Sequence, residues 1–237
     1  MARILLIETA TEICSVALAA EGRVLALCED LPPADHAARI TLLIDACVQQ
    51  SGIPLRDLDA VAVSRGPGSY TGLRVGASAA KGICYALGKP LIAVDTLEAL
   101  AWAALQQVDA ADKPGALLLP MIDARRQEVW TAAYDGALHC LAPAQPLLLT
   151  NELFENFISH LPDNGRYKCI VIAGSGSDKA VSGLNLRTTP YDAFPKCSAA
   201  HLAALAERHF LASDFQDVSY FEPFYMKPPN ITVPKNA

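Results

Sequence analysis

The chain has 237 residues and a formal net charge of −6, and 52% of its residues are hydrophobic against 19% that are charged. At roughly 150 residues per domain, this length allows one large domain or two small ones. The high hydrophobic share excludes a disordered chain, which combines low hydrophobicity with high net charge. The negative charge argues against a protein that binds nucleic acid on its own, because phosphate contacts need a basic surface.

The cysteine pattern and the first residues indicate the cellular compartment in which we expect the protein. The chain has seven cysteines, an odd number, and no Cys-x-x-Cys spacing, which is typical of reduced thiols rather than of a disulfide framework. Glu8 and Glu12 interrupt the apolar residues near the start, which a secretory signal does not tolerate. No apolar run approaches the ~20 residues of a membrane span. We therefore expect a cytoplasmic protein without membrane contact.

The first half of the chain predicts three strands followed by alternating helices and strands. Residues 4–7 are a continuous apolar run, typical of a strand buried on both faces, and Glu8 ends it. Glu21-Gly22 predicts a hairpin between two further strands. Beyond them, apolar residues recur with helical spacing between residues 40 and 48. The remaining elements expected in this half are a strand at 59–64, a helix at 71–87, a strand at 91–94 and a helix at 96–107.

Residues 116–142 repeat the pattern of the first three strands. An apolar run ends at Asp123, 115 residues after Glu8, and Asp135-Gly136 marks the second hairpin. Such internal similarity predicts a duplicated unit, with two α/β lobes at residues 1–110 and 111–237. The rest of the second lobe is expected to form a strand at 137–141, loops at 143–146 and 161–166, helices at 151–160 and 198–211, and a strand at 169–173.

A glycine-rich segment, residues 66–76, follows a predicted strand and opens a helix. Its glycines allow a close approach of the backbone, and Ser69 or Thr71 can cap the helix. Free N–H groups at such a terminus suit an anion. The glycine spacing, however, matches neither the Walker A loop nor the G-x-G-x-x-G fingerprint, so on its own it favours a tight strand-to-helix turn. We call this segment the signature loop, and its candidate residues are Gly66, Pro67, Gly68, Ser69, Tyr70, Thr71 and Arg74.

As a whole string, SRGPGSYTGLRVG (64–76) strongly resembles the signature of the bacterial TsaB (YeaZ) family. The resemblance continues in RILLIETATEICSVAL, GKPLIAVDTLEALA, MIDARRQEVWTAAY and YFEPFYMK, and it covers the first 135 residues well and the rest thinly. It implies the ASKHA fold of actin, sugar kinases and Hsp70, which is a βββαβαβα unit used twice.

The resemblance also implies a role in making threonylcarbamoyladenosine at position 37 of tRNA. A member of this family is a non-catalytic subunit that pairs with a TsaD-like catalytic subunit, while a TsaE-like ATPase regulates the cycle. The chain is then expected to form a homodimer when alone and to meet tRNA only through the complex.

Two positions bear on metal binding. The catalytic TsaD-like proteins carry a metal-binding His-x-x-x-His, and the matching positions here are Thr96 and Leu100. Leucine has no donor atom, and one threonine hydroxyl is a poor ligand for a transition metal. We expect no metal site, and the alternative of a glycoprotease-like metallopeptidase lacks its ligands.

Glu8 and Asp123, the acids at the first turn of each lobe, are called the turn acids here and are weak candidates for nucleotide binding. Glu8 and Asp123 match acids that handle metal and phosphate in kinases of the superfamily, although TsaB-like sequences commonly show Asp at the first position. Gly174 and Gly176 resemble a weak adenosine-contact loop. Because Mg²⁺ needs only one or two carboxylates plus phosphates, we expect no required cofactor and at most weak magnesium-nucleotide binding in the complex. The main alternative function is an ATP-dependent small-molecule kinase.

Two helices are candidates for a partner interface. The first carries a second apolar stripe beside its core stripe, and the second (71–87) is apolar or small nearly all round, so it must be covered on several sides. That cover is either the second lobe or a partner helix, as the resemblance implies. The candidate interface residues are Ala38, Leu42, Ala46, Gly72, Gly76, Ala80 and Ile83.

Overall fold

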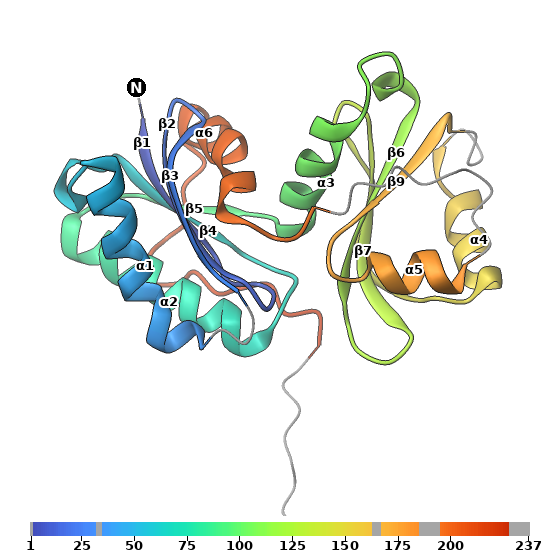
Figure 1. Ribbon diagram of the computed structural model, residues 1–237, viewed down its shortest axis with the longest axis horizontal. Helices are drawn as coiled ribbons and strands as arrows, with labels where there is room; N and C mark the ends of the chain where they lie inside the picture. The colour runs from blue at the N-terminus through green and yellow to red at the C-terminus, as the bar shows by residue number, and fades with distance from the viewer. Residues whose placement is uncertain (1, 32–34, 163–166, 185–194, 228–237) are drawn as a thin grey trace, which may run out of the picture.

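The computed structural model describes residues 2–31, 35–162, 167–184 and 195–227, and it consists of two α/β lobes side by side (Figure 1). The sheet of the first lobe has the strand order β3-β2-β1-β4-β5. Its strands are β1 (Arg3–Glu8), β2 (Cys14–Ala20), β3 (Arg23–Asp30), β4 (Ala60–Ser64) and β5 (Leu91–Val94).

Two helices, α1 (His36–Ser51) and α2 (Tyr70–Leu87), cover one face of this sheet. The side chain of Asp35 caps the start of α1, and Gly52, at φ +69°, ends it in the left-handed conformation that glycine adopts without strain. Of the predicted core stripe, Ile40, Leu43, Ile44 and Cys47 are buried against the sheet, and Val48 is half-buried. The helical periodicity therefore identified the core face of α1 correctly.

The second sheet repeats the pairing of the first. Its order is β8-β7-β6-β9, and β6 pairs antiparallel with β7 and parallel with β9, as β1 does with β2 and β4. This shared connection confirms the predicted duplication and the two-lobed ASKHA fold class. The second sheet has four strands in the described part of the chain, however, one fewer than the predicted βββαβαβα unit. The elements of the second lobe are β6 (Ala116–Asp123), β7 (Glu128–Asp135), β8 (Cys140–Leu148), α4 (Asn151–Ser159), β9 (Cys169–Ala173) and α5 (Ser177–Gly183).

Two helices lie between the sheets (Figure 1). The helix α3 (Thr96–Gln107) follows β5 of the first lobe but packs mainly on β6, β7 and β9 of the second. The helix α6 (Ala203–Leu211), preceded by a 3₁₀ turn (Ala199–Leu202), packs on β1, β3 and β5 of the first sheet. Residue 110 divides the two sheets, whereas the last helix of the chain returns to the first of them.

The strand β8 differs from its prediction. The sequence predicted a strand at 137–141 and a loop at 143–146, but one strand runs from Cys140 to Leu148 and includes Pro143 and Pro146. β8 is the edge strand of its sheet, and an edge strand can contain prolines that a central strand excludes. Most of the predicted loop at 161–166 lies outside the described residues.

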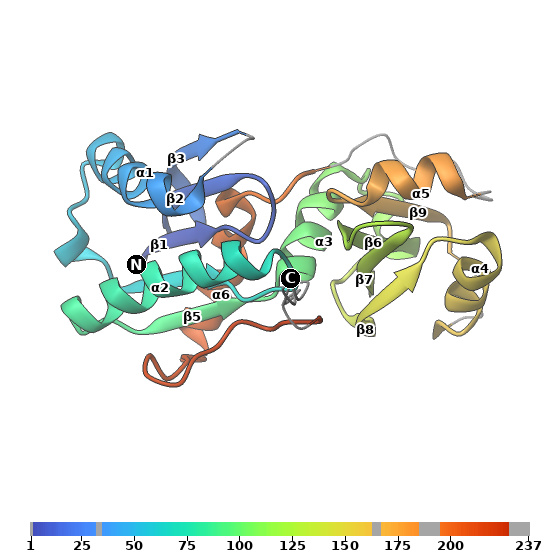
Figure 2. The ribbon, with the colours of Figure 1, turned by 90° about the horizontal axis from the view of Figure 1, so that it is seen from below.

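The last described residues run back along the first lobe, which Figure 2 shows beside β5. The amide of Gln216 donates to the carbonyl of Leu91 over 2.8 Å. The ammonium group of Lys81 on α2 donates to the carbonyls of Ser219 (3.2 Å) and Phe221 (3.0 Å). These contacts hold the segment, residues 216–227, against α2 and β5, and we call it the C-terminal strap.

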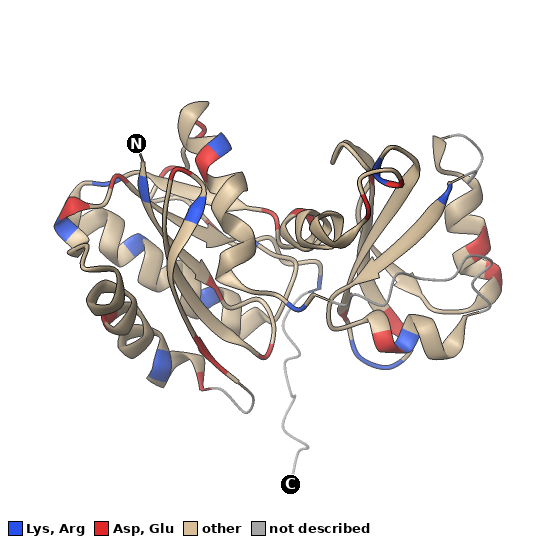
Figure 3. Cartoon of the chain, turned by 45° about the horizontal axis from the view of Figure 1, so that its top comes forward, with Lys and Arg blue, Asp and Glu red and all other residues tan. Residues whose placement is uncertain are grey.

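Two further properties of the described residues are the length and hydropathy of their helices and the distribution of their charges. No helix in the described part of the chain is both long and apolar enough to cross a membrane. Acidic and basic residues are interspersed over both lobes in the view of Figure 3.

Candidate functional site

A cleft of about 870 Å³ opens where the two lobes meet. The first lobe contributes the β1–β2 turn, the start of α1 and the signature loop, and the second contributes the β6–β7 turn and the loop after β9. The end of the C-terminal strap completes it. The lining residues with polar side chains are Thr11, Glu12, Asp35, His36, Ser69, Tyr70, Thr71, Asp123, Arg125, Trp130, Ser175, Tyr225 and Lys227.

Glu8, the first of the two turn acids, is buried beneath the cleft and does not line it. Its carboxyl accepts hydrogen bonds from the amide of Ala10 (2.6 Å) and the hydroxyl of Ser64 (2.9 Å). Burial raises the pKa of Glu8 to about 7, and these hydrogen bonds offset part of that rise. The carboxyl is therefore occupied in joining the ends of β1 and β4.

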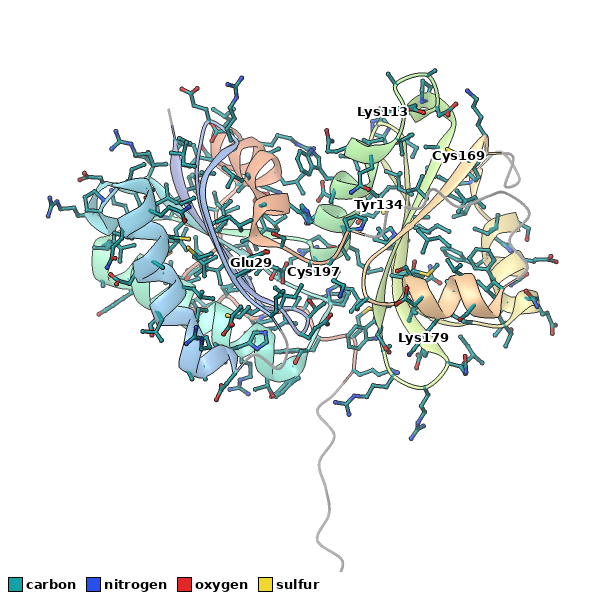
Figure 4. The ribbon with its side chains drawn as sticks, in the orientation of Figure 1. Glu29, Lys113, Tyr134, Cys169, Lys179 and Cys197 are labelled. Atoms are coloured by element: carbon teal, nitrogen blue, oxygen red, sulfur yellow. The ribbon has the colours of Figure 1, made fainter. Side chains whose placement is uncertain are left out.

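Asp123, the second acid, lines the cleft but is already paired. Its carboxylate accepts from the ammonium group of Lys179 on α5 and from the amide of Arg125 (2.6 Å). Lys179 also donates to the carbonyl of Arg126 over 2.8 Å, and Figure 4 labels it on α5 of the second lobe. Asp123 thus fixes the β6–β7 turn, in which Arg125 and Arg126 both adopt positive φ.

The predicted adenosine-contact loop packs against β6. Gly174 has φ +99°, and a Cβ there would lie 2.4 Å from the carbonyl of Met121. Gly176 donates its amide to that same carbonyl (2.9 Å), and the hydroxyl of Ser175 accepts from the amide of Asp123 (3.1 Å). Of this loop, Ser175 lines the cleft, whereas the two candidate glycines hold the loop against the strand.

The start of the signature loop is held by Thr96. The Thr96 hydroxyl accepts from the amide of Gly66 (3.1 Å), and the Thr96 amide donates to the Gly66 carbonyl (3.0 Å). The Gly66–Pro67 bond is cis, and Gly66 has a φ of +114°. A side chain at Gly66 would collide with the strap carbonyl of Phe224 at 2.4 Å, which explains the glycine.

The end of the signature loop caps α2, as predicted. The hydroxyl of Ser69 accepts from the amide of Gly72 (3.3 Å), and the Ser69 amide donates to the carbonyl of Ala10 (2.7 Å). The ring of Tyr70 stacks on Tyr225 of the strap, with centroids 4.7 Å apart, and Arg74 donates to the Tyr70 hydroxyl (2.7 Å). The loop is therefore a tight strand-to-helix turn that joins the β1–β2 turn to the strap.

The glycine strip of α2 faces inward, which corrects part of the predicted partner interface. A Cβ at Gly72 would lie 2.2 Å from the carbonyl of Thr9, and one at Gly76 would lie 2.3 Å from the Thr9 hydroxyl. Ala80 is fully buried in the core beneath α2, and Ile83 packs partly against it. The prediction that Gly72, Gly76 and Ala80 are available to a partner helix is wrong, because the protein's own β1–β2 turn and sheet cover them.

The second stripe of α1 is at the surface. Ala38, Leu42 and Ala46 are exposed, and Leu42 keeps 56% of its accessible area. α1 and α2 pack side by side, and Figure 2 shows both helices on one side of the first sheet. Ala38, Leu42 and Ala46, together with the half-buried Ile83, form what we call the α1–α2 surface.

The two positions that match a metal-binding pair do not fit a metal. Thr96 is fully buried with its hydroxyl on the Gly66 amide, and Leu100 lies in the core between α3 and the second sheet. Among the described residues, no three His, Cys, Asp or Glu side chains lie together as a metal site would require.

The sequence reasoning missed the role of the strap. YFEPFYMK was noted only as part of a resemblance, yet Tyr225 and Lys227 line the cleft and Lys227 forms an ion pair with Glu128 of β7. The strap thus joins both lobes at the mouth of the cleft. Its aromatic residues were the available signal, but nothing local specifies that they return to the signature loop.

Comparison with protein-family models matches residues 32–219 to the TsaD family, described as tRNA N6-adenosine threonylcarbamoyltransferase. The tRNA threonylcarbamoyladenosine biosynthesis protein TsaB of Escherichia coli is 42% identical over 132 residues, which cover 56% of this chain and 54% of that protein. The protein of the same name from Bacillus subtilis is 33% identical over 153 residues, 63% of this chain and 64% of that protein. The chain thus spans between half and two thirds of the length of these curated relatives.

Two solved structures from Pseudomonas aeruginosa share the fold over nearly the whole chain. An uncharacterized protein with similarity to peptidase YeaZ is 27% identical, with a TM-score of 0.80 over 96% of this chain and 100% of that one. YeaZ itself is 26% identical, with a TM-score of 0.78 over 95% of this chain and 100% of that one.

Proposed function

The chain belongs to the TsaB (YeaZ) family within the TsaD-like proteins, and from this premise we propose that it is a non-catalytic subunit for threonylcarbamoyladenosine synthesis at position 37 of tRNA. In this proposal it docks a TsaD-like catalytic subunit, and a TsaE-like ATPase regulates the assembly in the cytoplasm. Without its partner the chain pairs with a second copy, and tRNA is met only through the complex.

The main support for the proposal is that Thr96 and Leu100, at the positions of the metal ligands, have structural roles in this chain. A TsaD-like enzyme needs two metal ligands there, but this chain uses the Thr96 hydroxyl to hold the Gly66 amide and buries Leu100 in the core. No rotation of these side chains supplies a ligand pair. The place of the catalytic metal has become part of the packing, which supports a role other than the transfer itself.

The kinase alternative finds less support in the cleft. A kinase of this fold would bring the acid of each lobe to the nucleotide, whereas the carboxyl of Glu8 is buried under Ala10 and Ser64. Asp123 is at the cleft but is neutralised by Lys179. Of the two turn acids, Asp123 alone reaches the cleft, and it is already paired, so we propose that no cofactor is required and that any magnesium-nucleotide binding is weak.

The α1–α2 surface is where we propose that the partner docks. It is helical and apolar, and Leu42 is its most prominent exposed aliphatic side chain, at 56% exposure. An aspartate at this position would have to be desolvated without a counter-charge when a partner helix packs on it. A loss of about 3 kcal/mol in binding, which we expect for Leu42→Asp, corresponds to more than a hundredfold in Kd.

The test combines binding with the modification itself. The chain and a TsaD-like subunit are mixed, Kd is measured by calorimetry, and threonylcarbamoyladenosine in tRNA is quantified by mass spectrometry after adding a TsaE-like ATPase and substrates. We expect the full set to modify tRNA and this chain alone to yield none. Modification by this chain alone would overturn the non-catalytic assignment.

The matched control for the surface is Leu211→Asp. Leu211 is also exposed, at 75%, but it ends α6 on the other side of the first sheet. We expect Leu42→Asp to weaken partner binding and self-association while Leu211→Asp leaves both unchanged, with circular dichroism confirming that both variants fold. Wild-type affinity in a folded Leu42→Asp variant would place the interface elsewhere.

A further inference from the structure

Two cysteines lie together where α1 packs on the edge strand of the first sheet. Cys28 of β3 stands opposite Val16 of β2 in the antiparallel register. Cys47 of α1 directs its thiol onto the same place, since its Sγ donates to the carbonyl of Val16 over 3.1 Å. Val16 and Cys47 belong to the core cluster beneath α1, and the half-buried Cys28 packs against it.

The two thiols differ in access. β3 is the edge strand of its sheet, and Cys28 is partly exposed there, with its Sγ donating to the side-chain carbonyl of Gln50 at 3.5 Å. Cys47 is fully buried, and burial, together with the neighbouring Cys28 thiol, raises the pKa of the Cys47 thiol. A small oxidant arriving from solvent therefore meets Cys28 first and finds Cys47 directly behind it.

We propose that Cys28 and Cys47 form an oxidation site at which hydrogen peroxide converts the two thiols into a disulfide between β3 and α1. The Cys28 sulfur attacks one peroxide oxygen, so that an S–O bond forms, the O–O bond breaks and the departing hydroxide takes up the Cys28 proton as water. The Cys47 sulfur then attacks the Cys28 sulfur, forming the S–S bond as the S–O bond breaks. The departing oxygen leaves as a second water with the Cys47 proton, and two thiols have supplied the two electrons that reduce one peroxide.

The position of the pair gives the modification a structural consequence. Cys47 follows Ala46 and lies little more than one turn after Leu42 on the same helix, so the disulfide would tie the helix of the α1–α2 surface to the edge of the sheet. Closing the chain between residues 28 and 47 also restricts the unfolded state. Formation of the disulfide is independent of the proposed function, because it needs only this chain and an oxidant.

The experiment treats the full chain with a small excess of hydrogen peroxide and maps its peptides without reduction. The expected product is a cross-linked peptide pair that contains Cys28 and Cys47 and has lost two hydrogen atoms. The midpoint of thermal unfolding of the oxidised protein should rise by roughly 5–10 °C and return to its starting value after reduction with dithiothreitol.

Three variants make the assignment specific. Cys28→Ser, at the partly exposed position, should abolish the cross-link and the shift in unfolding midpoint, and Cys47→Ala should do the same by removing the buried sulfur. Cys140→Ser, which removes the exposed thiol of β8, should leave both intact. Absence of the Cys28–Cys47 peptide in oxidised wild-type protein would overturn the proposal, as would a link from Cys47 to Cys14 instead.

Discussion

The glycine strip of α2 allows a prediction in which one chemical change is made at two places in one helix. Gly72 and Gly82 both lie within α2, but a Cβ at Gly72 would stand 2.2 Å from the carbonyl oxygen of Thr9, while one at Gly82 would meet nothing within 4 Å. Replacing each by alanine therefore gives similar changes in backbone entropy, but only the change at Gly72 creates a steric clash.

The contact at Gly72 sets the magnitude. A distance of 2.2 Å is roughly 1 Å inside an ordinary contact, and the oxygen belongs to the backbone of the β1–β2 turn, so no side-chain rotation relieves it. Overpacking of this kind costs about 1–3 kcal/mol. At Gly82, by contrast, alanine stabilises the helix by roughly 0.5–1 kcal/mol.

Thermal unfolding followed by circular dichroism measures both effects. At about 2–4 °C per kcal/mol for a chain of this size, we expect Gly72→Ala to lower the unfolding midpoint by roughly 2–12 °C and Gly82→Ala to raise it slightly. A Gly72→Ala variant that unfolds at the wild-type temperature but no longer binds a partner would refute the reasoning. That result would return Gly72 to the predicted interface.

Three further predictions each concern one polar side chain and its hydrogen bonds. Burial raises the pKa of Glu8 to about 7 from its ordinary 4.5, so the folded state holds a proton that the unfolded state releases. Stability should therefore fall as pH rises from about 4.5 to 7, by up to roughly 3 kcal/mol, and urea unfolding of Glu8→Gln should show a smaller fall. Thr96→Val removes the acceptor of the buried Gly66 amide and should lower the free energy of unfolding in urea by about 1–3 kcal/mol. Lys81→Met removes both hydrogen bonds to the strap and should speed limited proteolysis within residues 216–227, whereas Lys89→Met should not.

The sequence was informative where a residue's partner lies nearby in the chain or where a pattern is local. The continuous apolar runs located β1, β4 and β6, and Ser69 was identified as a candidate cap of α2 from the residues beside it. The acids at the two first turns revealed the duplication, because each unit repeats the same local order of strand, turn and hairpin. These features depend on hydrogen bonds and burial within one supersecondary unit.

The direction in which α2 faces could not be obtained in the same way. The helix is apolar or small nearly all round, so its periodicity does not distinguish the face toward the sheet from the face toward solvent. The inward face of α2 is determined by Thr9, in a turn more than sixty residues earlier. Its carbonyl approaches Gly72 and its hydroxyl approaches Gly76. The same limit applies to Pro143 and Pro146. Proline interrupts a strand in the middle of a sheet but is tolerated in an edge strand, and the local sequence does not show which position the strand takes.

The arrangement of α3 and α6 links these points to the cleft. Each sheet needs cover on its inner face, and each receives it from a helix that the chain order associates with the other sheet. The segment before α6 also reaches the edge of the first sheet, where the hydroxyl of Ser198 donates to Glu29 over 2.7 Å, beside the Cys197 and Glu29 labels of Figure 4. The two lobes are thus connected in both directions along the chain, and the strap adds an ion pair from Lys227 to Glu128 at the cleft. α1 and α2 lie on the face of the first sheet opposite to α6, so the docking surface that we propose faces away from the second lobe and is open to a partner.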